Sequence, residues 1–108
     1  MSVGLYRLDR NNIPGDRIVY YQPVCTEAFY CEHWQRAVAE THSRFFEDQS
    51  KFSVKDVPVV LEELRRQKEW AYNNLSGRKL IYMVSSIENL EENLPIACEE
   101  NDLDFELF

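Results

Sequence analysis

The pattern of apolar and polar residues predicts an α+β fold, with a small mixed or antiparallel sheet of about four strands packed against two long helices and one short helix. Short segments rich in β-forming residues open the chain, segments of helical periodicity occupy its middle, and a strict alternation of acidic and apolar residues closes it. With 108 residues, the chain is long enough to bury one hydrophobic core, so we expect a two-layer single domain over residues 1–108.

The first predicted element is a β-hairpin. Residues 3–8 and 17–21 are rich in β-branched and aromatic side chains, and a polar segment lies between them. Within that segment, Pro14 and Gly15 suit the central positions of a type II turn, because proline has the required φ and glycine accepts a positive φ. We therefore expect two antiparallel strands joined by a rather long loop.

Two long helices are expected next. Thr26 can cap the first, which should reach about residue 47 with a buried stripe of Tyr30, Trp34, Ala37, Val38, Thr41 and Phe45. After a polar loop over residues 48–55, Asp56 can cap the second helix and Pro58 fits its first turn. Gly77 should end this helix, whose core face comprises Val57, Val60, Leu61, Leu64, Ala71 and Leu75.

Beyond the second helix, the pattern changes twice. Residues 80–84 form a nearly continuous apolar run, which is typical of a strand buried on both faces at the centre of a sheet. Ser85 and Glu88 have the spacing of a capping box, so a short helix should follow to about residue 93 and stop near Pro95. The pattern of residues 95–101 is ambiguous between helix and loop.

The last seven residues alternate acidic and apolar side chains, which predicts a half-buried strand. Its core face should consist of Leu103, Phe105 and Leu107. The other face should then carry a row of carboxylates about 6.6 Å apart, from Asp102, Asp104 and Glu106.

The net charge is confined to the C-terminal quarter of the chain. Residues 1–79 carry 12 basic and 11 acidic side chains, whereas residues 80–108 carry eight acidic side chains and no Lys or Arg, which accounts for the total of −7. Charges of one sign repel each other when they are concentrated in this way, and they favour a cationic partner.

No catalytic, metal or cofactor signature accompanies this charge. The three glycines are isolated along the chain, so there is no phosphate-binding loop. Neither the Cys and His spacings nor the acidic row matches a zinc or calcium site. A Cys–His pair could be drawn from Cys25, Cys31, His33 and His42, but no oxyanion-forming turn accompanies it. We expect a protein that is not an enzyme and has no cofactor.

The sequence also bears on location and on nucleic acid. It begins without the apolar region of a signal peptide, its longest apolar runs are far shorter than the roughly 20 residues of a membrane span, and an odd number of cysteines fits free thiols in a reducing cytoplasm. The basic residues near the end of the second helix are Arg65, Arg66, Lys68, Arg78 and Lys79. Glu62 and Glu63 can pair with the first two at helical spacing, and the last two suit a helix C-terminus, which indicates a solvated charged helix end. We expect a cytoplasmic protein that contacts neither membrane nor nucleic acid directly.

A protein-binding surface is therefore the favoured site. Aligned carboxylates would select a basic partner, and aromatic side chains would anchor it. The candidate partner-binding residues are Asp102, Asp104, Glu106, Glu99, Glu100, Glu91, Glu92, Trp70 and Tyr72. In the alternative interpretation, the acidic residues only discourage pairing at a sheet edge, and the two aromatic residues pack against the sheet.

Four features together resemble bacterial immunity proteins of contact-dependent growth inhibition and related polymorphic toxin systems: acidity, no catalytic motif, an aromatic segment at residues 17–21 and an acidic strand ending at Phe108. The resemblance implies a cognate toxin, encoded beside this protein and neutralised in a one-to-one complex. A nuclease is the expected toxin, because nucleases have cationic clefts. The alternatives are an adaptor or regulatory subunit, including a nucleic-acid mimic, and a small Cys–His enzyme.

Overall fold

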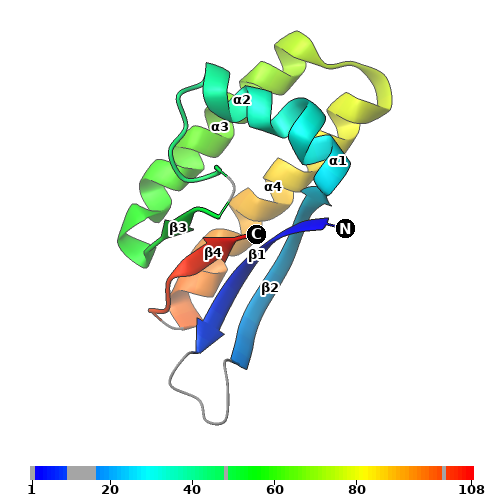
Figure 1. Ribbon diagram of the computed structural model, residues 1–108. Coiled ribbons are helices and arrows are strands. Elements are labelled where there is room, and N and C mark those ends of the chain that lie inside the picture. Colours follow the sequence, from blue (N-terminus) through cyan, green and yellow to red (C-terminus); the bar gives the residue numbers. More distant parts are fainter. Residues whose placement is uncertain (1, 10–16, 48, 101) are drawn as a thin grey trace.

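The computed structural model describes residues 2–9, 17–47, 49–100 and 102–108, and it confirms the α+β class (Figure 1). The strands are β1 (Ser2–Asp9), β2 (Arg17–Thr26), β3 (Lys51–Phe52) and β4 (Phe105–Leu107). They form one antiparallel sheet in the order β2-β1-β4-β3. The helices are α1 (Glu27–Phe29), the π-helix η1 (Tyr30–Trp34), α2 (Gln35–Glu40), the 3-10 helix η2 (Val54–Asp56), α3 (Val57–Asn74) and α4 (Gly77–Glu100).

The sheet has two different faces. The covered face meets the helix layer, in which α3 packs along α4, and it contributes Leu5, Phe52, Phe105 and Leu107 to the core. In Figure 1, strands β1, β2 and β4 lie in front of α4, and no described helix covers their other side. We call that other side the open face.

The predicted hairpin is present. In its register, Tyr6 lies opposite Tyr21 and Leu5 lies opposite Gln22, and two bulges interrupt the pairing. The second strand continues to Thr26 instead of ending at residue 21. The predicted turn at Pro14 and Gly15 lies outside the described residues.

The first helix starts as predicted but is shorter. The Thr26 hydroxyl caps it by accepting the Phe29 N–H (3.1 Å), whereas the last helical residue is Glu40 and not residue 47. A buried carboxylate from α3 explains the early end, because Glu63 accepts the backbone N–H groups of Arg44 and Phe45 at 3.1 Å and holds that segment in an irregular conformation. Accordingly, Thr41 and Phe45 are only partly buried, whereas the core contains Tyr30, Trp34, Ala37 and Val38.

The second long helix is confirmed over most of its length. Pro58 lies in its first turn as predicted, but the Asp56 side chain does not cap α3: it accepts from Ser53 N–H and Oγ (3.0 Å each) and completes a capping box at the start of η2, where Ser53 is the N-cap. The short strand β3 lies within the predicted loop. On the expected core face, Leu61 and Leu75 are only partly buried, and the fully packed members are Val57, Val60, Leu64 and Ala71.

The largest correction concerns residues 77–100. The predicted central strand over residues 80–84 and the short helix after it are both wrong, because one continuous helix, α4, spans them. Its buried residues recur at helical steps, namely Met83, Val84, Ile87, Leu90, Leu94 and Ala97. Gly77 (φ 61°) begins this helix and does not end the previous one, and Pro95 lies inside it.

A buried arginine stabilises the end of α4 beyond Pro95. The guanidinium of Arg7 donates to the carbonyl of Ala97 (2.5 Å) and to that of Leu103 (2.9 and 2.6 Å), and it lies 4.2 Å from the centroid of the Phe105 ring. This contact joins the last turn of α4 to the start of β4. The predicted C-terminal strand is confirmed but is shorter than expected: β4 spans Phe105–Leu107 and lies between β1 and β3 in the sheet.

Candidate protein-binding surface

The acidic residues at the C-terminus do not form the continuous ladder that the sequence predicted. Only Glu106 lies within β4, since Asp102 and Asp104 precede the strand. A cation also enters the row, because Lys51 lies opposite Glu106 in the β3–β4 pairing and its Nζ is 3.7 Å from Oδ2 of Asp104. The strand therefore presents a mixed group of charges.

Three carboxylates of α4 form a separate surface, which we call the acidic stripe: Glu88, Glu92 and Glu99. All three are exposed. Steps of four and seven residues place them within about 40° of one another around the helix axis. They lie on the side of α4 opposite its buried residues, so the stripe faces away from the sheet. The folded chain thus divides its acidic charge between the helix layer and the strand.

The remaining predicted carboxylates of α4 have different surroundings. Glu91 faces α3, where its Oε1 accepts from Lys68 Nζ (2.7 Å), and this hydrogen bond raises the pKa of Lys68 above its usual value. Glu100 is exposed near the end of α4, as is Asp102 beyond it, and both charges act on buried Arg7. Glu91 therefore stabilises the contact between the two long helices, while Glu100 and Asp102 remain accessible to solvent.

Three aromatic side chains gather on the open face, and we call them the aromatic cluster: Tyr6, Tyr21 and Phe108. Tyr6 stacks on Phe108 with ring centroids 4.4 Å apart, and its centroid is 4.8 Å from that of Tyr21. Tyr21 and Phe108 are each 46% exposed. Glu106 lies opposite Tyr6 in the sheet, so carboxylate and ring surface adjoin. Desolvation and the neighbouring Tyr21 raise the pKa of Tyr6 above its ordinary value.

A glycine lets these rings lie close to the sheet. A Cβ at Gly4 would be 2.6 Å from Cε1 of Tyr21 and 3.0 Å from Cε2 of Tyr6. Gly4 also exchanges both backbone hydrogen bonds with Phe108 (2.8 and 3.0 Å), which places these two residues side by side on β1 and at the end of β4. Any larger residue at position 4 would displace the rings.

Sequence reasoning named part of this cluster but did not assemble it. The sequence pattern indicates an aromatic segment that ends at Tyr21, but it gives no special role to Tyr6. The available signal was the alternation of the last seven residues, because Phe108 has the same parity as Glu106 and so shares its face. Which strands lie side by side could not be read from that alternation.

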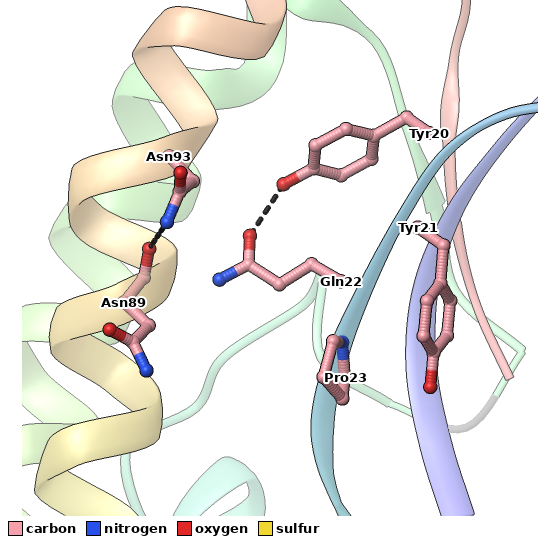
Figure 2. Close-up of a pocket in the computed structure, with 6 residues that line it drawn as sticks. All are labelled: Tyr20, Tyr21, Gln22, Pro23, Asn89 and Asn93. Atoms are coloured by element: carbon pink, nitrogen blue, oxygen red, sulfur yellow. Dashed lines mark hydrogen bonds between the residues drawn. The ribbon is translucent and has the colours of Figure 1, made fainter.

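A groove runs between the outer strand of the sheet and α4, and Figure 2 shows its polar part. Tyr20 and Gln22 point from β2 toward Asn89 and Asn93 of α4, whereas the Tyr21 ring lies on the other side of β2 (Figure 2). The Tyr20 hydroxyl donates to Oε1 of Gln22 (2.5 Å), and burial raises the pKa of Tyr20. This hollow has a volume of about 290 Å³.

A second hollow of about 270 Å³ extends the same seam toward Thr26 and Tyr82. The two hollows share Pro23 and Asn89. Together they form one channel along β2, which we call the β2–α4 groove. Its described wall residues are polar or small over most of its length, and none is charged.

The two predicted aromatic anchors are not neighbours of the acidic strand. Trp70 is only 6% exposed and packs in the core with the Arg36 guanidinium 5.6 Å from its ring centroid, so it has little surface to offer a partner. Tyr72 is 60% exposed. It lies about 22 Å along α3 from the end that joins β3, the strand next to β4. The aromatic cluster, and not this pair, accompanies the strand carboxylates.

Among the described residues, the cysteines and histidines form neither an activated nucleophile nor a metal-ligand cluster. Burial raises the pKa of the Cys25 thiol to about 12, and it also raises that of Cys98, which is the opposite of what a nucleophilic thiolate needs. Cys31 is exposed. Over the described ranges, no three His, Cys, Asp or Glu side chains come together as metal ligands, and no helix is long and apolar enough to cross a membrane.

The basic residues of the second helix are separated in the structure. Arg65 pairs with Glu62 and Glu69 on the surface of α3, whereas Arg78 and Lys79 lie in the first turn of α4 and not at the end of α3. Comparison of the chain with protein-family models, curated proteins and solved structures finds no match.

Proposed function

We propose that this chain is an inhibitor that binds a basic protein domain through the open face of its sheet. The aromatic cluster beside Glu106 is the observation that supports this proposal. Stacked rings that leave Tyr21 and Phe108 nearly half exposed offer an apolar anchor in a rigid strand setting. Tyrosine and other aromatic side chains dominate the energetics of protein interfaces, because they bury much area at a small entropic cost.

The charge of the protein specifies the chemistry of the partner. A net charge of −7 with an exposed acidic stripe and strand carboxylates favours encounter with a cationic surface. An acidic partner would be repelled before the rings could make contact, and a neutral one would lack this attraction. The acidic residues would thus set the rate and selectivity of association, and the aromatic cluster would set the lifetime of the complex.

In the particular form that we favour, the partner is a nuclease toxin domain encoded beside this protein, and the inhibitor acts in the cytoplasm by occupying its cationic cleft. Both the resemblance to immunity proteins and the concentrated acidic charge support this form. The inhibition would be steric and electrostatic and would need no chemical step.

The test uses the neighbouring basic protein as the partner. The two proteins are purified together in low salt, and the activity of the partner is assayed with and without this chain. The variants Tyr21→Ala and Phe108→Ala should each weaken the complex roughly tenfold or more. The matched control is Tyr72→Ala, which removes an even more exposed tyrosine far from the open face and should leave affinity unchanged.

Three outcomes would count against the proposal. A failure to form any complex in low salt would make it wrong. A complex that depends on Tyr72 and not on the aromatic cluster would place the interface elsewhere. A complex that forms with the expected variant pattern but leaves the partner fully active would favour the adaptor interpretation over the inhibitor.

A further inference from the structure

The outer strand β2 has one edge to which no described strand is paired. The orientation of its backbone follows from the neighbouring strands. Gly4 directs its N–H and C=O to Phe108 on β4, so Pro23, which lies opposite Gly4 on β2, directs its own backbone groups away from the sheet. Tyr21, two residues away, has the same orientation and therefore presents both an N–H and a C=O at the free edge.

At the C-terminal end of β2, the backbone N–H at this edge already has a partner. The N–H of Thr26 donates to the hydroxyl of Tyr82 on α4 (2.9 Å). Pro23 has no N–H to offer, so at that position only its carbonyl is available. The accessible backbone groups thus centre on Tyr21, which also belongs to the aromatic cluster on the open face.

The β2–α4 groove provides space beside this edge. On β2 it extends from Tyr20 to Thr26, which is about 20 Å of strand. An extended peptide of about six residues spans that length. Alternate side chains of such a peptide would enter the groove toward Gln22 and Asn89, while the others would lie on the side of Tyr21.

We propose that the β2–α4 groove receives an extended, basic segment of the partner protein as a fifth strand paired to β2. This proposal rests on the proposed function and specifies how the partner is held. Charge complementarity argues for the occupant: the groove wall is uncharged, the chain as a whole carries −7, and Glu92 is three residues from Asn89, which makes it the member of the acidic stripe nearest the groove and within reach of a lysine side chain. A second copy of this chain would instead bring two charges of −7 together.

The test uses a synthetic hexapeptide in which lysine alternates with threonine, labelled for fluorescence anisotropy. Two further versions carry backbone N-methyl groups on one or the other alternate set of residues. N-methylation removes the N–H donors of one edge and keeps every charge. If the peptide pairs with β2, the version methylated on the N–H groups that face β2 should bind at least tenfold more weakly than the parent peptide. The version methylated on the opposite edge should bind much more tightly than the first.

Protein variants locate the binding. Asn89→Trp should fill the groove and weaken binding of the unmodified peptide at least tenfold, whereas Val59→Trp, at an exposed position in the first turn of α3 beside the opposite edge of the sheet, should not change it. Hydrogen exchange adds a direct readout, since the Tyr21 amide should become protected when the peptide binds. Circular dichroism of both variants checks that they fold.

Equal binding of both methylated peptides would show attraction by charge alone and would overturn strand addition, as would no binding of the unmodified peptide in low salt. These outcomes are separate from those of the proposed function. A toxin complex that weakens with Phe108→Ala but tolerates Asn89→Trp would retain docking on the open face and reject the added strand.

Discussion

The two faces of the sheet use similar side chains for different purposes. On the covered face, Phe105 and Phe52 stack at 5.0 Å and are fully enclosed, and the charged group of Arg7 is held there by backbone carbonyls. On the open face, Tyr6 and Phe108 stack as closely but remain accessible. Similar stacked aromatic pairs therefore contribute to stability on the covered face and leave exposed contact surface on the open face. The difference arises because the helix layer packs on only one of the two faces.

The largest expected effect is the loss of folding stability in Arg7→Met, which tests the role of the covered face. Methionine retains much of the apolar volume but leaves the carbonyls of Ala97 and Leu103 without their buried donor, so the free energy of unfolding should fall by about 3 kcal/mol. Urea denaturation measures the change. Arg78→Met, an exposed control, should stay within about 0.5 kcal/mol of the parent. Equal losses in both variants would mean that Arg7 does not hold the covered face together.

A second prediction concerns the helix layer of the covered side. Glu63→Ala removes the carboxylate that accepts the N–H groups of Arg44 and Phe45, so it should lower the free energy of unfolding by about 2 kcal/mol. Its neighbour Glu62 is exposed and pairs with Arg65 on the surface, so Glu62→Ala should lower the free energy of unfolding far less. Thermal unfolding of the two variants, measured side by side, tests the difference; similar values would contradict it.

Gly4→Ala tests whether the aromatic cluster on the open face needs the space that glycine leaves. Because the new Cβ would lie 2.6 Å from the Tyr21 ring, the ring must move, and we expect a loss of stability of about 1 kcal/mol. The binding defect should exceed what this loss explains, since the aromatic cluster is rearranged. Near-ultraviolet circular dichroism of the tyrosines reports the movement. An unchanged spectrum and affinity would show that the open face tolerates a methyl group there.

The smallest expected effect is on the pH dependence of folding stability, and it comes from Asp56 in the turn between β3 and α3. Hydrogen bonds from Ser53 lower the pKa of Asp56 below its ordinary value of 3.8. A lowered pKa stabilises the fold above the pKa of the unfolded chain, and this contribution disappears as the pH falls through the folded value. Urea midpoints measured from pH 5 to pH 2 should therefore fall less steeply for Asp56→Asn than for the parent. Parallel curves would be inconsistent with this role of Asp56.

Local signals in the sequence were sufficient for several elements. The hairpin, the cap at Thr26 and the position of Pro58 in α3 each depend on residues within one or two turns of chain, and the structure confirms them. The alternation before Phe108 likewise predicted a strand, although only its last part, Phe105–Leu107, is paired. Such signals are reliable because neighbouring residues alone satisfy the geometry.

The region from Gly77 to Glu100 shows where local signals fail. An apolar run of five residues fits a buried strand and a helix equally well. In the structure, Ile81 within that run is 66% exposed while Met83 and Val84 are buried, which is a helical and not a sheet pattern. Contacts with the sheet and with α3, absent from any local window, select the helix and carry it past Pro95.

The candidate surface was predicted in the same partial way. The sequence alone determined that the acidic charge lies in the last quarter of the chain and that Phe108 and Glu106 share a strand face, because composition and parity are properties of consecutive residues. Only the tertiary structure decided that the carboxylates divide between α4 and β4, that Lys51 enters the row, and that Tyr6 meets Phe108. Those outcomes depend on which strands pair and on which side the helices pack, and both are settled by contacts between residues far apart in the chain.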